Sequence, residues 1–571
     1  MVCSLLVGKV AIITITFSCE LCHRSVSNTS FGMRGARIHG LLAAFMLPTV
    51  QSQSGSAILS FVDPLIGTVN GGHVFAGASL PFAMAKAVAD VNGEDQGGFA
   101  SDNSNITGFS HMHDSGTGGS PSLGYFPIFP QSGCVNDELD GCAFSKTSRA
   151  TPRINGTARA SPGYFSIEMA TQIKAEMTTT NHTALYRFTF PCVPAEANAT
   201  LSPLILADLS DLPDSRINGS IEVDPTTGRI TGNGTFSPSF GIGSYSTYFC
   251  ADFSGAAVRD TGVFMNNRAG SEPKSLSVVQ DGINVSPEIL PAGAWTRLHA
   301  PTSSSANQIL ARVGVSFISV AQACSNAEAE IPTFDFEAVH SAAKAAWTET
   351  LGVVSVTPGP GVNDSLLRTF WSGIYRASLS PQDYTGENPL WNSSEPYYDS
   401  YYCIWDSFRS IHSLITILDP LSQIRMMKSL VDIYRHEGWL PDCRMSLCKG
   451  FTQGGSNADV ILTDMYLKMG RLAKDYGMDW ATTYEALMKD AEAEPMNWAV
   501  EGRGGLASWK TLHYIPTDDF DPYGVGPFTR SISRTVEYAY DDFCVGEMAM
   551  GLGHTADAQK YYERSGYWRY V

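Results

Sequence analysis

The sequence predicts an α+β protein in which a β-sandwich is followed by a helical domain. Three observations lead to this prediction. The chain has 571 residues, enough for two large domains. Residues 56–335 contain many short runs of β-branched and aromatic residues between turn signals, whereas the apolar period becomes helical beyond Ala338. Apolar residues make up 43% of the chain, which suffices for extensive cores and argues against wholesale disorder.

The chain is strongly acidic, with a formal net charge of −18 and a pI near 5.1. Long-range repulsion at this charge opposes association with nucleic acid and with anionic membrane surfaces. This repulsion does not oppose the binding of a neutral ligand such as a sugar. A soluble acidic extracellular protein would account for the charge by itself.

Residues 1–55 are predicted to be a targeting leader. Two largely apolar runs occur there, at 5–17 and 41–50, and the second has the layout of a signal peptide, with two arginines before it. We expect Met33 to be the true start and the preceding residues to be an upstream extension. The alternatives are that the first run is the signal or that one run is a membrane anchor. Both runs are shorter than the roughly 20 apolar residues that span a bilayer, so no stable membrane association is expected.

Sequons and cysteines favour a secreted, extracellular protein. The N-x-S/T sequons after the leader lie at Asn105, Asn155, Asn181, Asn198, Asn218, Asn233, Asn284, Asn363 and Asn392. The twelve cysteines are consistent with an oxidising compartment. Two pairs, Cys134 with Cys142 and Cys443 with Cys448, are close enough to close small loops, although the sequence does not fix the connectivity.

The predicted sandwich occupies residues 56–335. Its clearest strand signals are the runs at 163–171, 183–191 and 311–319, and its clearest turn signals are the dipeptides Asn155-Gly156, Asn218-Gly219 and Asn233-Gly234. Many short strands at close spacing are typical of a β-sandwich.

Residues 336–362 are predicted to be a linker, formed by a helix over 338–354 and a Pro/Gly-rich stretch over 356–364. The helical domain is predicted to span 363–571. Its apolar stripes consist of Ile404, Phe408, Ile411, Ile415 and Leu418, then Met427, Leu430 and Tyr434, and finally Val536, Tyr540 and Phe543.

Five sequence blocks occur together in this chain. They are GGHVFAGASLPFAMAKAVAD (71–90), GGFASDNSNITGFSHMHDSGTGG (97–119), YYCIWDSFRSIHSLITILDP (401–420), GWLPDC (438–443) and SRTVEYAYDDFCVGEMA (533–549). In order and content they resemble the family 92 glycoside hydrolases, calcium-dependent inverting exo-α-mannosidases, in a fungal-like form. The resemblance runs from about residue 61 to 571. It implies a β-sandwich followed by an (α/α)6 toroid, and the roughly 210 residues after the linker lead us to expect an incomplete, C-terminally truncated toroid.

Glu537 is the candidate general acid. Glycoside hydrolysis needs a protonated carboxyl to donate to the leaving oxygen, and an inverting enzyme needs a second carboxylate about 6.5–9.5 Å away. The stripe of Val536, Tyr540 and Phe543 is expected to place Glu537 beside apolar neighbours, and the charge of Asp541 one turn on would favour a protonated Glu537. By pattern alone, a solvated acidic helix face is the alternative. The resemblance implies that Glu537 is the acid.

The WDSFR motif supplies the candidate sugar-binding residues. On a helix Trp405 and Arg409 are four residues apart, with Asp406 beside them, and an indole can stack on a pyranose while charged groups hold its hydroxyls. The alternative is an ordinary Asp–Arg salt bridge with Trp405 in the core. The resemblance implies that all three bind the terminal mannose. Phe99, in GGFASD, is a further candidate for stacking at the pocket rim.

No metal site is expected from the residues of this chain. His111 and His113, with Asp114 beside them, are reminiscent of a zinc site, but the sequence offers no distant third ligand for the His-x-His pair. We expect this glycine-rich loop to pack near the domain junction and to help shape the pocket. The resemblance implies calcium. We expect its ligands, and the second catalytic carboxylate, to be absent, because no matching stretch occurs after the acid helix.

The resemblance implies a glycosidase that removes terminal α-linked mannose from N-glycans or mannans, in the manner of an α-1,2-mannosidase, by inversion. We expect little activity from these 571 residues by themselves. Two alternatives stay open. One is a non-catalytic mannose-binding remnant, and the other is a different sugar hydrolase or phosphorylase of the same architecture.

Overall fold

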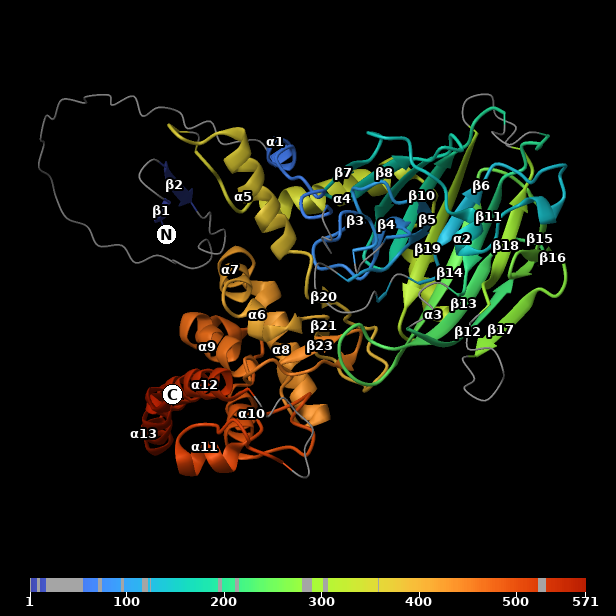
Figure 1. Cartoon of the computed structure of the whole chain (residues 1–571). Helices are drawn as coiled ribbons and strands as arrows, with labels where there is room; N and C mark the ends of the chain where they lie inside the picture. The colour runs from blue at the N-terminus through green and yellow to red at the C-terminus, as the bar shows by residue number, and fades with distance from the viewer. Residues whose placement is uncertain are drawn as a thin grey trace, which may run out of the picture.

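The computed structural model describes residues 2–7, 11–16, 55–69, 74–93, 97–114, 122–123, 125–193, 198–210, 215–279, 290–300, 307–357, 359–521 and 530–571. A strand-rich part and a helical part lie side by side, with the strands at the right of Figure 1 and most helices at its lower left. The proposed start at Met33 and the second apolar run lie outside the described residues. In the first run, β1 (Val2–Val7) and β2 (Ala11–Thr16) pair as an antiparallel hairpin.

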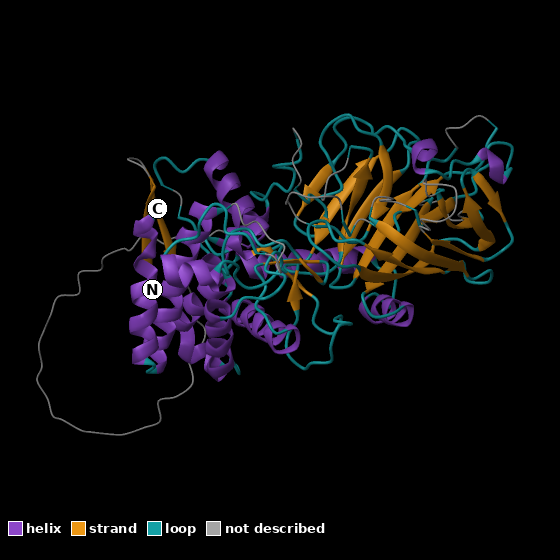
Figure 2. Cartoon of the chain, turned by 60° about the horizontal axis from the view of Figure 1, so that its bottom comes forward, coloured by secondary structure: helices purple, strands orange, loops and turns teal. Residues whose placement is uncertain are grey.

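The strand-rich part contains two large sheets whose paired strands are antiparallel, shown in orange in Figure 2. The nine-stranded sheet has the spatial order β17 (Ser275–Val279), β12 (Arg216–Val223), β13 (Ile230–Phe236), β14 (Tyr245–Ser254), β19 (Gln308–Ser316), β10 (Thr183–Thr189), β9 (Lys174–Thr179), β8 (Tyr164–Glu168) and β7 (Arg159–Ser161). The eight-stranded sheet has the order β16 (Arg268–Gly270), β15 (Val258–Met265), β18 (Ala292–Leu298), β11 (Leu204–Asp208), β6 (Ile128–Gln131), β5 (Ile106–Ser110), β4 (Lys86–Val91) and β3 (Ala78–Ser79).

Aromatic residues fill the space between the two sheets. Phe109 of the eight-stranded sheet meets Phe188 of the nine-stranded sheet edge-on, with ring centroids 5.5 Å apart, and both side chains are fully buried. The three predicted strand runs form β8, β10 and β19, so the sandwich and these strands are confirmed.

Two of the three predicted turns are wrong. Asn155-Gly156 is a turn, with Gly156 at φ +74°. Asn218-Gly219 lies inside β12, however, and Asn233-Gly234 lies inside β13. A Cβ at Gly219 would lie 2.8 Å from the Leu209 Cδ1, and one at Gly234 would lie 2.5 Å from the Phe236 ring. These glycines therefore serve close packing within strands rather than a positive φ.

Two helices follow the sandwich and cover it. They are α3 (Val320–Glu330) and α4 (Phe336–Leu351), and α4 confirms the helix predicted over 338–354. The fully buried Trp347 of α4 donates its indole N–H to the Ser79 carbonyl at 2.7 Å, which fixes this helix to the edge strand β3. The Pro/Gly-rich stretch then leads to α5 (Asp364–Ala377), which Asn363 caps through its side chain.

The remaining elements belong to the helical part or lie beside the sandwich. The helical part contains α6 (Ile404–Ser407), α7 (Ile411–Leu418), α8 (Pro420–Glu437), α9 (Ala458–Asp475), α10 (Trp480–Glu492), α11 (Leu506–Leu512), α12 (Ser531–Leu552), α13 (Thr555–Arg564) and the 3-10 helix η4 (Ser565–Tyr570). Its short strands are β20 (Gln382–Asp383), β21 (Tyr398–Asp399), β22 (Tyr402–Cys403), β23 (Cys443–Met445) and β24 (Cys448–Lys449). Short helices beside the sandwich are α1 (Gly55–Leu59), η3 (Leu139–Gly141) and α2 (Lys146–Arg149).

The predicted apolar stripe from Ile404 to Leu418 is interrupted. It spans two helices, α6 and α7, because the backbone leaves the helical conformation at Ser410, where φ is −152°. Ile404 and Ile415 are nevertheless buried, as the stripe requires. The first three residues of the WDSFR motif lie in the short helix α6, and Phe408 and Arg409 lie in the turn that follows it.

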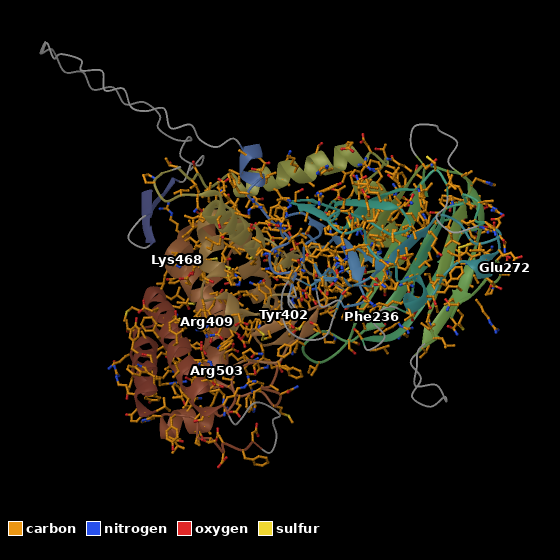
Figure 3. All side chains as sticks on the ribbon, turned by 45° about the horizontal axis from the view of Figure 1, so that its top comes forward. Phe236, Glu272, Tyr402, Arg409, Lys468 and Arg503 are labelled. Carbon is orange, nitrogen blue, oxygen red and sulfur yellow. A yellow bond between two sulfur atoms is a disulfide. The ribbon has the colours of Figure 1, made fainter. Side chains whose placement is uncertain are left out.

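Buried polar contacts join the sandwich to the helical part. Glu387 is 2% exposed, and its carboxylate accepts hydrogen bonds from the Ser316 hydroxyl, the Phe317 N–H and the Asn326 amide. Nearby, Phe240 of the sandwich stacks on Tyr402, which Figure 3 labels at the boundary between the two parts. The position of the WDSFR segment, which follows Tyr402, is therefore set partly by the sandwich.

Three disulfides lie in the described residues. Cys134 pairs with Cys142, as the spacing allows, and Cys250 pairs with Cys324. Cys443 pairs with Cys403 rather than with its sequence neighbour Cys448, because β22 and β23 are adjacent strands. None of the described helices is both long and apolar enough to cross a membrane.

Candidate active site

Three segments distant in sequence meet at Glu537 on α12. Its Oε1 accepts a hydrogen bond from the Arg409 Nη2 at 2.8 Å, and its Oε2 accepts one from the Asn457 Nδ2 at 3.2 Å. Arg409 follows α6, and Asn457 is the residue before α9. The Glu537 side chain is 12% exposed, so it remains accessible at the edge of the helical part.

The environment of Glu537 is polar, which makes the predicted apolar one wrong. Val536, Tyr540 and Phe543 are 41–45% exposed and lie on the outer side of α12. The helix instead buries a face that includes Asp541 and Asp542. Val536, Tyr540 and Phe543 do recur at helical spacing, but they do not lie on the buried face of α12.

A buried arginine explains why α12 turns its acidic face inward. Arg503, labelled in Figure 3, donates hydrogen bonds to Asp459 of α9 at 2.5 Å and to Asp542 of α12 at 2.7 Å. Its Nε lies 3.8 Å from the Asp541 Oδ2. Burial raises the pKa of Asp541 and of Asp459, and the charge of Arg503 opposes that rise. This charge cluster holds α9 against α12 and so fixes the rotation that presents Glu537.

Trp405 and Arg409 lie together, as the WDSFR spacing predicts. The guanidinium carbon of Arg409 is 4.9 Å from the centroid of the Trp405 ring. The Trp405 Nε1 is buried and has no hydrogen-bond partner in the described part of the chain. Asp406 is exposed beside them. The structure thus brings Trp405 and Arg409 to Glu537 and leaves Asp406 at the rim.

Asp442 is a member of the site that the sequence reasoning missed. It is 2% exposed, its Oδ2 accepts the Gln453 N–H at 3.0 Å, and its carbonyl accepts the Ile404 N–H at 2.7 Å. Burial, together with the charges of Glu537 and Asp406, raises the pKa of Asp442 to about 7. Its place in the GWLPDC block was the available signal, but nothing in the sequence showed that it lies next to WDSFR.

The turn at Gly454-Gly455 lies close to Trp405 and Glu537. A Cβ at Gly454 would lie 3.8 Å from the Trp405 Nε1, and one at Gly455 would lie 3.0 Å from the Glu537 Cβ. The same Cβ at Gly455 would lie 3.1 Å from the Asp541 Oδ2. Two consecutive glycines just before a helix are a sequence signal for such a close approach. The sequence analysis did not use this signal.

Buried polar atoms without partners gather around this turn. Among the described residues, the Trp405 Nε1 lacks an acceptor, and three oxygens lack donors: Asp442 Oδ1, Asn457 Oδ1 and Asp541 Oδ1. A buried polar atom without a partner costs about 1–3 kcal/mol, so such a concentration calls for a ligand or ordered water. One donor and several acceptors suit a molecule that carries hydroxyl groups.

Phe99 is not brought to this site. Its side chain is 3% exposed, packs edge-on against Phe165 of β8 at a centroid distance of 5.1 Å, and lies under the guanidinium of Arg153. A ring enclosed in the sandwich core has no free face for a sugar. The stacking role predicted for Phe99 is therefore corrected to a packing role.

The His-x-His motif also has a structural role. His111 contacts the Tyr186 hydroxyl and the Phe126 carbonyl, at 2.7 and 2.9 Å. His113 contacts the Lys86 carbonyl and the Asp90 carboxylate, at 2.9 and 2.8 Å. Because both nitrogens of each ring are engaged, neither histidine is free to ligate a metal in this arrangement.

Comparisons with known proteins agree with this architecture. Residues 61–316 match the N-terminal domain of glycosyl hydrolase family 92, and residues 322–571 match its catalytic domain. An uncharacterized secreted glycosidase of Arthroderma benhamiae is 52% identical over 532 residues, which cover 93% of this chain and 64% of that protein.

Solved structures show the same fold. An inverting family 92 mannosidase of Bacteroides thetaiotaomicron superposes with a TM-score of 0.73 at 22% identity, covering 90% of this chain and 65% of that one. A family 92 α-mannosidase of the same bacterium, in complex with mannoimidazole, has a TM-score of 0.71 at 22% identity, covering 90% and 64%. The chain thus spans just under two thirds of the length of these relatives. With both family domains matched in order over almost its whole length, the chain belongs to glycoside hydrolase family 92.

Proposed function

We propose that the site at Glu537 binds a terminal α-linked mannose and that Glu537 is the general acid of its hydrolysis. The observation that carries this proposal is the meeting of Glu537 with Trp405 and Arg409 around buried polar atoms that lack partners. Two structural neighbours named as mannosidases support the choice of sugar. The substrates are N-glycans or mannans with α-1,2-linked terminal mannose, and the mechanism is inverting.

Each residue of the site has a role suited to its chemistry. Trp405 offers an indole face and an N–H donor to the pyranose, and Asp442 and Asn457 offer buried oxygens to its hydroxyls. Asp406 and Arg409 hold hydroxyls at the rim. Glu537 gives its proton to the glycosidic oxygen as the C1–O bond breaks, and water attacks C1 from the opposite face and releases one proton to solvent, which leaves free mannose and the shortened glycan. We assign no residue of this chain to the activation of that water.

The contact between Arg409 and Glu537 favours a second candidate function, a mannose-binding protein without turnover. A guanidinium at 2.8 Å stabilises the carboxylate, whereas a general acid must carry a proton. A substrate must therefore displace Arg409 before Glu537 can donate. For the 571-residue chain alone we propose binding with little release of mannose.

Calcium enters the proposal only as a family expectation. The described residues include no group of three or more His, Cys, Asp or Glu side chains suited to hold a metal ion. Two acidic groups of the neighbouring charge cluster, Asp459 and Asp542, are engaged by Arg503. No step of the proposed reaction runs through a calcium ion.

We further propose that the protein is secreted and glycosylated. Its fungal relative is described as a secreted glycosidase, and the sequon residues Asn155, Asn181, Asn198, Asn363 and Asn392 are exposed. An extracellular location would place the protein among the mannose-containing glycans that the site is proposed to bind.

The deciding experiment compares the chain with its Glu537→Gln variant. Glutamine can still accept the hydrogen bond from Arg409 but cannot act as an acid. Binding of mannoimidazole is measured by calorimetry, and mannose release is measured on an N-glycan and on mannan. Release by the unaltered chain at least about 100-fold above the variant would establish hydrolysis by Glu537. Binding by both with no release would establish the binding protein, and no binding by either would refute both functions.

A further inference from the structure

We propose that Asn392 carries an N-linked glycan whose first sugar lies in a pocket beside Trp391. Asn392, Ser393 and Ser394 form a sequon in the loop between β20 and β21, and all three residues are exposed. An exposed loop is where a sequon of a secreted protein is modified. This inference rests on secretion and makes no use of the site at Glu537.

The pocket has the size and chemistry of a site for a small polar ligand. Its volume is about 500 Å³, within the roughly 300–1,000 Å³ that is typical of such sites. Its lining includes Asn392 itself, together with Asn388, Trp391, Glu395 and Asp432. N-acetylglucosamine, with hydroxyl and acetamido groups around an apolar ring face, matches carboxylate, amide and indole groups.

Trp391 is held in a fixed orientation at this pocket. Its indole N–H donates to the Asp432 carboxylate at 2.9 Å, and its ring stacks on His436 with a centroid distance of 5.0 Å and an interplanar angle of 10°. An aromatic side chain that is already oriented loses little conformational entropy when a sugar packs against it. The sugar covalently attached to the neighbouring residue is also held at high effective concentration.

Two other sequons, at Asn155 and Asn233, lack these features. Asn155 is also exposed, but it lies on a turn where a Cβ at Gly156 would meet no described atom within 4 Å. Asn233 is inside β13, and its Nδ2, the atom that would be modified, donates to the Ser220 hydroxyl at 2.7 Å. Asn155 is therefore the matched control for a glycan that has no pocket.

The modification itself needs a lipid-diphosphate-linked oligosaccharide, which the secretory pathway of the host supplies. The bond between C1 of its first N-acetylglucosamine and the diphosphate oxygen breaks, and C1 bonds to the Asn392 Nδ2. The amide loses one proton, and the lipid diphosphate leaves. No oxidation or reduction takes place.

The test uses the full chain secreted from a eukaryotic host, with Ser394→Ala and Ser394→Thr as a matched pair. Both variants keep Asn392, but only threonine preserves the sequon. Glycopeptide mass spectrometry is expected to find a glycan at Asn392 in the unaltered chain and in Ser394→Thr. Under native conditions, peptide-N-glycanase is expected to release the Asn392 glycan about tenfold more slowly than the Asn155 glycan, because the pocket shields its first sugar.

Hydrogen exchange over residues 386–397 supplies a second measurement. The segment is expected to exchange about tenfold more slowly in Ser394→Thr than in Ser394→Ala, since only the former has a sugar over the pocket. An unmodified Asn392 would overturn the proposal. A glycan that is released as fast as that of Asn155, or equal exchange in the two variants, would overturn the packing of the sugar in the pocket.

Discussion

Arg409 and Glu537 are joined by an ion pair of 2.8 Å between residues 128 positions apart in the chain. The contact connects the WDSFR segment to the helix that carries the proposed acid. Arg409 is 47% exposed, so the pair can open to solvent and to a ligand. The arrangement leads to five predictions.

The first prediction concerns Arg409. Arg409→Gln should weaken binding of mannoimidazole by about tenfold or more, because the guanidinium is placed to hold a sugar hydroxyl. Its effect on the free energy of unfolding should stay below about 1 kcal/mol, as for other exposed ion pairs. The control is Arg425→Gln, which removes a pair of 2.7 Å with Asp383 at a similar exposure of 45%. Equal binding by the two variants would contradict the role of Arg409.

The second prediction concerns pH and Asp442. Its pKa rises from an ordinary 3.8 to about 7 in the folded state, so the folded protein holds a proton that the unfolded chain releases. The stabilisation linked to this proton is fully present below pH 4 and is lost as the pH rises through 7, by about 4 kcal/mol at most. Urea unfolding should show a smaller loss of stability between pH 5 and 8 in Asp442→Asn. An unchanged pH dependence would show that Asp442 does not hold this proton.

The third prediction concerns the glycine turn. Gly455→Ala should weaken binding of mannoimidazole by about tenfold or more, because the new methyl group would push against the Glu537 Cβ at 3.0 Å. The thermal midpoint should change less than the affinity, because the substitution adds a single methyl group. Gly359→Ala is the control, since its Cβ would meet no described atom within 4 Å. Unchanged binding of mannoimidazole by Gly455→Ala would show that the turn does not contribute to the binding site.

The fourth prediction concerns the disulfide between Cys403 and Cys443. Cys403 lies two residues before WDSFR and Cys443 directly follows Asp442, so the disulfide holds these two segments of the site together. Replacing both cysteines by serine should cost about 4 kcal/mol for its separation of 40 residues, and the same change at Cys134 and Cys142 about 2.5 kcal/mol for a separation of 8. Calorimetry should show weaker binding of mannoimidazole only in the first double variant. Equal loss of binding in both would indicate a general effect on stability.

The fifth prediction concerns Arg503. Arg503→Gln should lower the free energy of unfolding by about 3–5 kcal/mol, because the buried carboxylate of Asp459 would lose its counter-charge, while Asp542 would keep only its pair with Arg564. Lys468→Gln removes an exposed pair with Asp464 on α9 and should change stability by less than about 0.5 kcal/mol. Chemical denaturation of the two variants measures both values. Similar small effects would mean that Arg503 does not fix the rotation of α12.

The sequence alone determined the order of the two parts and most of their elements. Strand runs such as 183–191 and the helix at 338–354 could be predicted because the periodicity of apolar residues is local information. The family blocks likewise pointed to Glu537, Trp405 and Arg409, which the structure brings together. Spacing of four residues was enough to pair Trp405 with Arg409.

Only the tertiary structure decided which faces are buried and which distant residues meet. Val536, Tyr540 and Phe543 form an apolar stripe, yet α12 buries Asp541 and Asp542 because Arg503 neutralises them from another segment. Phe99 was predicted to stack on a sugar, but its ring packs against Phe165 in the sandwich. Asp442 belongs to the site because its carbonyl accepts the Ile404 N–H, a contact between segments distant in sequence. A sequence records periodicity within a segment. Which partner a charge or ring finds across the chain depends on long-range packing, and that packing is set by the fold as a whole.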